Sequence, residues 1–249
     1  MTGTSHWNPA HNLRVAVEDK PWDLPEALQD EVEAAWKTWR RDFFRGPVLS
    51  LVGAENTAQG PVLQTRWTDY AHFLYSARTL NPRHPFYVRV VFAAGCLISR
   101  DGFLMAAVMG PETTRPGWVQ AVGGSADPSD VTLGRLDAVA SALREVREET
   151  GLNLTSSDLS REVAVVGYTQ DVRDGSAAIA VKAELTATAD EVRRQFHIFQ
   201  AQQENSELAD LVAIPLGMAG LSWLRDEGRR AVRYLEPLLL APELQPGTK

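Results

Sequence analysis

Three glutamates crowd the segment REVREETGL, residues 144 to 152, on one side of an expected helix. Glu145, Glu148 and Glu149 follow one another at steps of three and one, a spacing that puts their side chains on neighbouring parts of one helical face. Gly151 is the expected helix end, and carboxylates near that end face the negative pole of the helix dipole. Like charges at this spacing also repel one another. The arrangement therefore indicates that the acids hold a cation.

Carboxylate oxygens without nitrogen or sulfur partners favour a hard cation, for which Mg²⁺ and Mn²⁺ are the usual choices. Such ions often bind phosphates as well. The pair Gly123-Gly124 precedes the acidic segment, and glycine lets a backbone approach a ligand closely. We expect the glycine pair and the acids to form one site. The alternative is an acidic helix face that is simply solvated.

An apolar stripe must hold this helix in place. At a pitch of about 100° per residue, the stripe lies nearly opposite the glutamates and consists of Leu136, Val139, Leu143 and Val146. The segment is therefore predicted to be an amphipathic helix that buries one face and presents acids on the other.

From Gly124 onward the chain resembles the signature of the Nudix hydrolases. That signature is a glycine, five residues, a glutamate, seven residues and then R-E-U-x-E-E-x-G-U, where U is a bulky aliphatic residue. The run from Arg144 to Leu152 matches it at every defined position. The first half departs from it, because Asp130 replaces the glutamate and thirteen residues separate Asp130 from Arg144. The longer loop leaves the role of Asp130 open.

The resemblance covers about residues 86 to 216 and implies hydrolysis of a nucleoside diphosphate linked to another group. It implies that Glu145, Glu148 and Glu149 hold Mg²⁺, for which Mn²⁺ can substitute, with help from the Gly124 carbonyl. Arg144 would orient the glutamates, and an ordinary ion pair with Glu148 is the alternative reading of this arginine.

The family often draws a general base from one of these glutamates or from a later loop. Glu207, in NSELADLVAIP, is the candidate in the later loop, and Glu204 is the second choice. An acid that is merely exposed to solvent is the alternative for both.

The substrate is suggested by the region before the signature. The stretches FFRGPVLSLV and RWTDYAHFL, with the elongated loop after Gly124, are similar to the UDP-sugar diphosphatase branch. That likeness implies conversion of UDP-glucose or UDP-galactose to UMP and a sugar 1-phosphate. ADP-ribose or a dinucleotide polyphosphate is an alternative substrate. A Nudix module that binds a nucleotide without turnover is the alternative outside enzymes.

A nucleobase needs an aromatic wall, and a phosphorylated sugar needs hydrogen-bond donors. Candidates for these contacts, each of which could instead be a core or rim residue, are Gly123, Tyr70, Phe73, Tyr87, Arg115 and Trp118.

Composition narrows the class of protein. The 249 residues are 44% hydrophobic and 23% charged, with a net charge of -7, which argues against a nucleic-acid or anionic-membrane surface. We expect a cytoplasmic protein, because no signal peptide is visible and the longest apolar run, VVFAAGCLI, is too short to span a bilayer. The resemblance implies a small-molecule substrate. Cys96 should be a small buried hydrophobe. The five histidines lack metal-ligand spacing. The sequence does not predict an oligomeric state.

Strands and helices alternate in a way that predicts an α/β (α+β) class, and the resemblance implies an α/β/α sandwich with a mixed sheet and an N-terminal helix-strand extension. We expect a loose lead-in at 1–22, an N-terminal α/β subdomain at 23–85, and the Nudix-like domain at 86–249. The first helix of the subdomain spans LPEALQDEVEAAWKTWRRDFF, and the second begins after Thr68 as its cap. The chain is expected to close with one helix, GLSWLRDEGRRAVRYLEPLLL.

Overall fold

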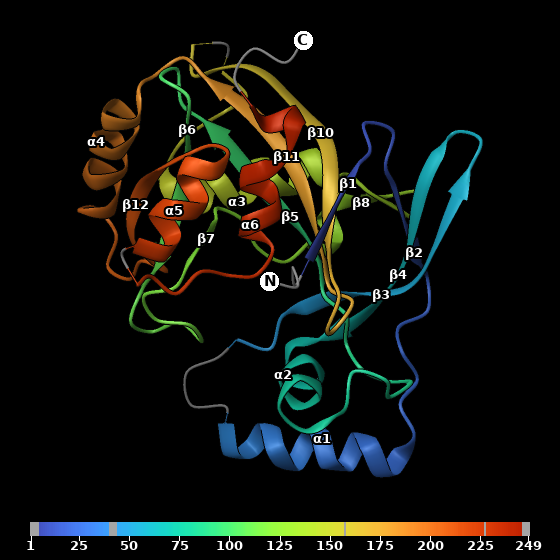
Figure 1. Cartoon of the computed structure of the whole chain (residues 1–249). Coiled ribbons are helices and arrows are strands. Elements are labelled where there is room, and N and C mark those ends of the chain that lie inside the picture. Colours follow the sequence, from blue (N-terminus) through green and yellow to red (C-terminus); the bar gives the residue numbers. More distant parts are fainter. Residues whose placement is uncertain (1–4, 40–43, 157, 227, 246–249) are drawn as a thin grey trace.

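The protein was analysed as a computed structural model that describes residues 5–39, 44–156, 158–226 and 228–245 (Figure 1). Within these residues the larger sheet has seven strands, in the order β1-β10-β11-β5-β6-β12, with β7 paired to β6. The β11–β5 pair is parallel and the other pairs are antiparallel. The strands are β1 (Ser5–Pro9), β5 (Val91–Ile98), β6 (Phe103–Met109), β7 (Val119–Ala121), β10 (Ser160–Asp171), β11 (Ala177–Leu185) and β12 (Leu208–Pro215).

Helices cover both faces of this sheet, because its central strands are apolar on both sides. Along β5, Ala94 and Cys96 pack with the C-terminal helices, while the alternate residue Leu97 packs with the acidic helix on the other face. The helices are α3 (Ala138–Thr150) and α4 (Ala189–Gln200) on one face, and α5 (Met218–Asp226) and α6 (Leu235–Leu240) on the other. The predicted α/β sandwich with a mixed sheet is confirmed.

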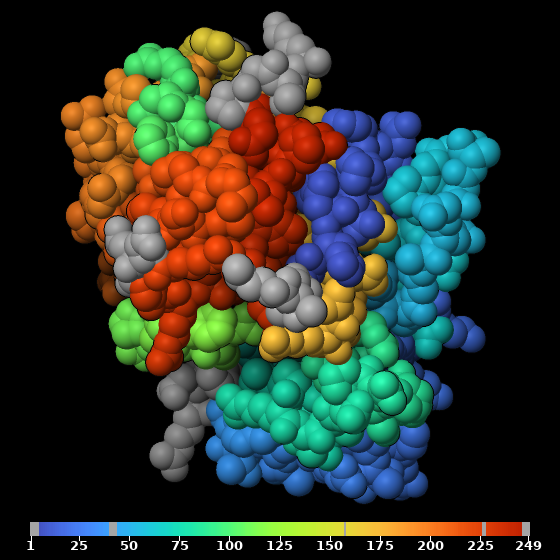
Figure 2. All heavy atoms as spheres, in the orientation of Figure 1, coloured from blue at the N-terminus to red at the C-terminus, as the bar shows by residue number. Residues whose placement is uncertain are grey.

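A smaller mixed sheet lies beside the first and carries two helices at one end of the molecule (Figure 1). Its strand order is β3-β4-β2-β9-β8. The helices bury Val32 and Trp36 against Ala71, Leu74 and Tyr75. These elements are β2 (Arg14–Glu18), α1 (Glu26–Trp39), β3 (Pro47–Thr57), β4 (Gly60–Asp69), α2 (Tyr70–Thr79), β8 (Val131–Thr132) and β9 (Arg135–Leu136). In the space-filling view the two helices, in blue and teal, form the lower end of the molecule, below the red and orange C-terminal segment (Figure 2).

The expectation of a loose lead-in at 1–22 was wrong for its described part. Strand β1 adds to the edge of the larger sheet beside β10, and β2 lies inside the smaller sheet between β4 and β9. Val15 and Val17 point into the core from β2, the alternation of a half-buried strand. The predicted division after residue 85 stays a prediction, although residues 131–136 join the smaller sheet.

One further local expectation needs correction, and another falls partly outside the described residues. The cap of α2 is Asp69, whose side chain accepts a hydrogen bond from the His72 N–H, rather than Thr68. The first helix ends in the described chain at Trp39, and residues 40–43 of its expected range lie outside the described residues.

The expected single C-terminal helix is two helices separated by an extended segment. Residues 230–232 run along β7, where the Val119 N–H donates to the Arg230 carbonyl at 2.7 Å and the Val232 N–H donates to the Val119 carbonyl at 3.0 Å. Helical periodicity of the flanking residues could not show this, because the competing hydrogen bonds come from a strand that is distant in sequence. No helix among the described residues has the length and apolar character of a membrane span.

Candidate active site

Helix α3 begins and ends at well-defined caps. The Asp137 carboxylate accepts a hydrogen bond from the Ala140 N–H at 2.9 Å at the start. At the end, Gly151 takes a left-handed conformation with φ of 73°, which favours glycine. A side chain there would also meet the Phe199 ring at 2.5 Å. The predicted helix and its end at Gly151 are therefore confirmed, but Leu136, expected on its apolar stripe, lies in β9 before the helix begins.

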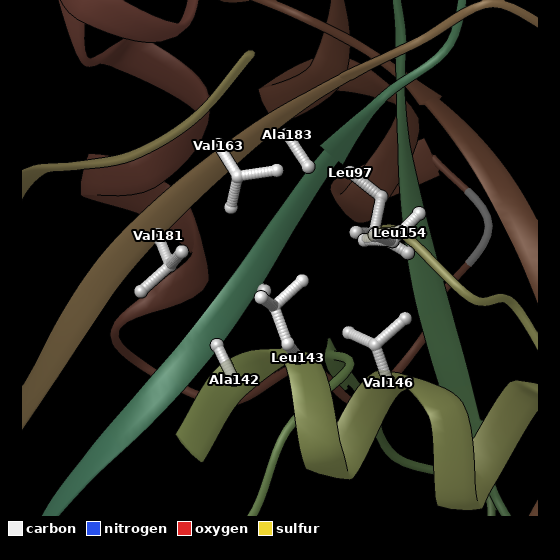
Figure 3. A pocket seen from close by; sticks show the side chains of 9 residues that line it. Leu97, Ala142, Leu143, Val146, Leu154, Val163, Val181 and Ala183 are labelled. Carbon is white, nitrogen blue, oxygen red and sulfur yellow. The ribbon is translucent and has the colours of Figure 1, made fainter. Parts of the chain in front are cut away.

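The apolar face of α3 packs on the larger sheet. Val146 is buried with Leu143 packed against the same core cluster, and Val139 is partly buried against the neighbouring cluster. Figure 3 shows Ala142, Leu143 and Val146 directed from the helix toward Leu97 and other strand residues, where they line a small apolar pocket. This packing fixes the rotation of α3 and therefore where the opposite, acidic face lies.

Two of the three glutamates meet the glycine pair. The Gly123 N–H donates to the Glu149 carboxylate at 3.2 Å. A Cβ atom on Gly124 would lie 2.4 Å from a Glu145 carboxylate oxygen, so only glycine leaves room for that carboxylate. The expected association of the glycine pair with the acids is found for Glu145 and Glu149.

These two carboxylates are poorly compensated by the protein. Burial raises the pKa of Glu149 well above its ordinary value, and the charges of Glu145 and Glu207 raise it further. Burial also raises the pKa of Glu145, although the Arg144 guanidinium opposes this shift. Buried like charges of this kind are costly unless a cation lies among them.

Arg144 joins the acids to the loop before the helix. Its guanidinium donates to Asp130 at 2.8 Å, to Glu145 at 2.7 Å and to Glu148 at 3.1 Å. It also donates to the Ser125 carbonyl at 3.1 Å. Arg144 therefore does more than form a simple ion pair with Glu148, because its planar guanidinium contacts three carboxylates and one carbonyl.

A short hairpin places Asp130 close to the start of α3. Residues 131–136 form β8 and β9, and the Asp137 N–H donates to the Asp130 carbonyl at 2.9 Å across the base of the hairpin. The hairpin turn has positive φ at both Leu133 and Gly134, as in the tight turns that suit antiparallel strands. Six residues are thus looped out, and the chain beyond them continues as though Asp130 directly preceded Asp137.

Glu148 differs from its two neighbours. Its side chain is 60% exposed and paired with Arg144. Among the described residues, no group of three or more His, Cys, Asp or Glu side chains is arranged to hold a metal ion. The oxygen-only set of Glu145 and Glu149, its excess negative charge and the open Gly124 position still fit a hard divalent cation.

Of the two later acids, Glu207 is the one whose charge acts on the site, because it raises the pKa of both Glu145 and Glu149. Its backbone is fixed by the Gly110 N–H, which donates to the Glu207 carbonyl at 2.7 Å. Its side chain is exposed, as is that of Glu204.

Several of the expected substrate residues gather beside Glu207. The Arg115 guanidinium lies over the Trp118 ring at 5.3 Å. Tyr70, at the start of α2, forms a side-chain hydrogen bond with Thr114, and the charges of Arg115 and Glu207 act on its hydroxyl. The loop before β7 and the first turn of α2 therefore meet near the acids. Phe73 packs on Tyr70 with ring centres 5.5 Å apart.

Tyr87 is not brought to this group. It is buried, and the charged groups that act on its hydroxyl are Asp174, Arg233, Arg89 and Asp171. It lies in the segment that leads into β5, where the Ala177 N–H donates to the Val90 carbonyl at 2.8 Å. Ala177 begins β11 directly after the β10–β11 turn, so Tyr87 lies near that turn. The closeness of Tyr87 to β5 in the sequence did not predict this position.

Comparisons with known proteins add little to this geometry. No protein-family model matches the chain, and no curated protein matches it. Among solved structures, the chain is similar to a NUDIX hydrolase from Nitrosomonas europaea, at 10% sequence identity and a TM-score of 0.35. The similarity covers 59% of this chain and 84% of the other. A likeness at this TM-score assigns neither family nor activity, and the functional argument therefore rests on the residues of this chain.

Proposed function

We propose that the protein is a Mg²⁺-dependent hydrolase that cleaves the diphosphate of a nucleoside diphosphate-linked substrate. The favoured substrate is UDP-glucose or UDP-galactose, with UMP and a sugar 1-phosphate as products. The observation that carries the proposal is the convergence of Glu145 and Glu149 on the Gly123-Gly124 pair, with Glu145 tied to Asp130 through Arg144.

Glu145 and Glu149 would hold the cation, with Glu148 released from Arg144 to join them and the Gly124 carbonyl nearby. Bound Mg²⁺ supplies positive charge for the diphosphate and lowers the pKa of the attacking water. Arg144 keeps the Glu145 carboxylate oriented toward Gly124 through its 2.7 Å hydrogen bond. The low exposure of the Glu145 and Glu149 carboxylates strengthens their interaction with any cation, because little water competes for it.

Glu207 is the proposed general base, since it is exposed and electrostatically coupled to both buried glutamates. A base there could accept the proton of the attacking water. Arg115 is the proposed cationic contact for phosphate, and Tyr70 and Trp118 form an aromatic wall for the base or sugar.

The test is a panel of nucleoside diphosphate conjugates incubated with Mg²⁺ and scored for release of a mononucleotide. UDP-hexoses are expected to be hydrolysed faster than ADP-ribose or dinucleotide polyphosphates. Faster hydrolysis of either alternative would change the substrate assignment and leave the reaction class intact. Stoichiometric nucleotide binding without turnover, at saturating Mg²⁺ or Mn²⁺, would instead identify a binding module.

The Gly124→Ala variant is expected to lose activity without losing its fold. The added Cβ would lie 2.4 Å from a Glu145 oxygen, so the carboxylate must move, and displacements of this size cost roughly 100-fold in rate. The measurement is kcat with the best substrate of the panel, together with a thermal melt. Gly228→Ala is the matched control, because a Cβ there meets nothing within 4 Å and Gly228 lies outside the proposed site. It can cost stability through its positive φ but should retain kcat. Equal activity of the two variants would contradict the role given to Gly124.

A further inference from the structure

A pocket outside the candidate active site lies between α1, the first turn of α2 and the end of β4. Its volume is about 480 Å³, which falls within the range of small-molecule sites. The segment that joins β2 to α1 forms one wall and runs beside β4 (Figure 1). No lining residue belongs to the candidate active site. The residues that give the pocket its chemistry are Trp22, Asp23, Glu33, Arg45, Trp67 and Asp69.

Two indole rings form the aromatic part of this pocket. The Trp22 backbone N–H donates to the Trp67 carbonyl at 3.0 Å, which holds the two residues together. The Trp22 ring is tilted against His72 with ring centres 5.2 Å apart, and it meets Phe86 edge-on at 6.0 Å. These contacts fix the Trp22 ring, so an aromatic surface is in place without a ligand, and little ordering is required on binding.

His72 adds no charge to the pocket. Its side chain is buried, and its Nε2–H donates to the Phe86 carbonyl at 2.8 Å. Its Nδ1 accepts from the Thr68 hydroxyl at 2.8 Å. Burial lowers the pKa of this imidazole, so the ring is neutral at pH 7.

The remaining charged groups leave the pocket negative. Arg45 forms ion pairs with Glu33 at 2.6 Å and with Asp69 at 2.8 Å. The Asp23 carboxylate has no hydrogen bond or ion pair with another side chain in the described part of the chain. Three carboxylates therefore line the pocket with one guanidinium, an excess of two negative charges among its described residues. A phosphate compound such as the proposed substrate is disfavoured here by like-charge repulsion.

We propose that this pocket binds a small organic cation, whose ammonium group contacts the indole rings and the Asp23 carboxylate. The face of an aromatic ring attracts a cation, and tryptophan does so most strongly. Arg45 does not supply this cation, because it is paired with Glu33 and Asp69 and lies over the Trp36 ring instead. The inference goes beyond the proposed function and does not depend on it.

The test uses choline as the probe and its carbon isostere, which has the same shape without the charge, as the matched control ligand. Binding to the full chain is followed through the indole N–H resonances of the seven tryptophans, without nucleotide. Choline should shift, in a saturable way, the resonance that disappears in Trp22→Leu, and the isostere should leave it unchanged. The absence of a saturable shift up to about 10 mM choline, or an equal shift with the isostere, would overturn the inference.

Asp23→Asn tests the charge. This side chain is exposed, so the melting temperature should stay unchanged while the affinity for choline falls about fivefold. Asp19→Asn is the matched control, because Asp19 is exposed in the same segment and does not line the pocket. Unchanged affinity in Asp23→Asn, or an equal loss in both variants, would contradict the site. The binding assay needs no turnover, so failure of the proposed hydrolysis and failure of this inference are distinguishable.

Discussion

Glu149→Gln should abolish hydrolysis and, at the same time, make the metal-free protein more stable. Loss of residues that merely support metal ligands costs about 10- to 100-fold, so loss of a proposed ligand should cost more than about 100-fold in kcat. The stability gain follows because burial and the charges of Glu145 and Glu207 disfavour the ionised carboxylate. Glutamine keeps the size and removes the charge. Mg²⁺ should raise the melting temperature of wild type and not that of the variant.

The pH dependence of this gain has a definite sign. The folded-state pKa of Glu149 lies above its ordinary value of 4.5, so the folded protein binds this proton more tightly than the unfolded chain does. Its contribution to stability therefore falls as the pH rises from 4.5 through the raised folded pKa. The stability advantage of Glu149→Gln should be small near the lower limit and grow across that window.

Glu148→Gln should separate the loss of hydrolysis from the gain in metal-free stability. This residue is 60% exposed and paired with Arg144, so its substitution should leave the metal-free stability nearly unchanged. If Glu148 turns to the cation when Mg²⁺ binds, the variant should still lose its hydrolytic activity. Full activity of Glu148→Gln on UDP-hexoses would remove Glu148 from the metal site. Unchanged activity of both variants would reject the site as a whole.

The acidic helix was predictable from the sequence because its determinants are local. The spacing of the glutamates, the apolar stripe that includes Val146, and the glycine at 151 all lie within a few turns. The central strand β5 of the larger sheet was predictable for the same reason. It carries its own periodicity, as the alternating packing of Ala94 and Cys96 against Leu97 illustrates.

What the sequence could not predict depends on partners far along the chain. Strand β1 is ordered by β10, more than 150 residues away, and nothing within residues 5–9 indicates that partner. The extended segment at 230–232 replaces helical hydrogen bonds with bonds to Val119.

The segment between Asp130 and Arg144 shows how a hairpin can bring together two side chains that are well separated in sequence. Counting residues from Asp130 to Arg144 did not predict that their side chains meet, because six of the residues between them form the β8–β9 hairpin. The hairpin belongs to the smaller sheet through the pairing of Ala16 with Arg135. The strand that pairs with this hairpin, β2, lay in the region expected to be a loose lead-in.

Arg144→Lys and Asp130→Asn should both reduce activity by about 10- to 100-fold, since each removes support from proposed metal ligands. Lysine keeps the charge but cannot reproduce the planar fork that contacts Asp130, Glu145 and the Ser125 carbonyl together. Asp130→Asn removes the charge of a carboxylate whose side chain is 6% exposed and leaves the guanidinium without that counter-charge. Metal affinity should fall with activity in both variants.

The stability of Asp130→Asn should depend on pH in the direction opposite to that of Glu149→Gln. Burial alone would raise the pKa of Asp130, but hydrogen bonds from Arg144 and the Asp127 N–H outweigh burial and lower it. The ionised carboxylate therefore stabilises the fold above its ordinary pKa of 3.8, and this contribution is lost as the pH falls through the lowered folded value. At neutral pH the variant should lose about 1–3 kcal/mol. Denaturant unfolding of both single variants and the double variant would measure the coupling. Additive losses would mean that the ion pair does not organise the site, whereas a double variant no less stable than either single one would confirm that Asp130 and Arg144 act as a unit.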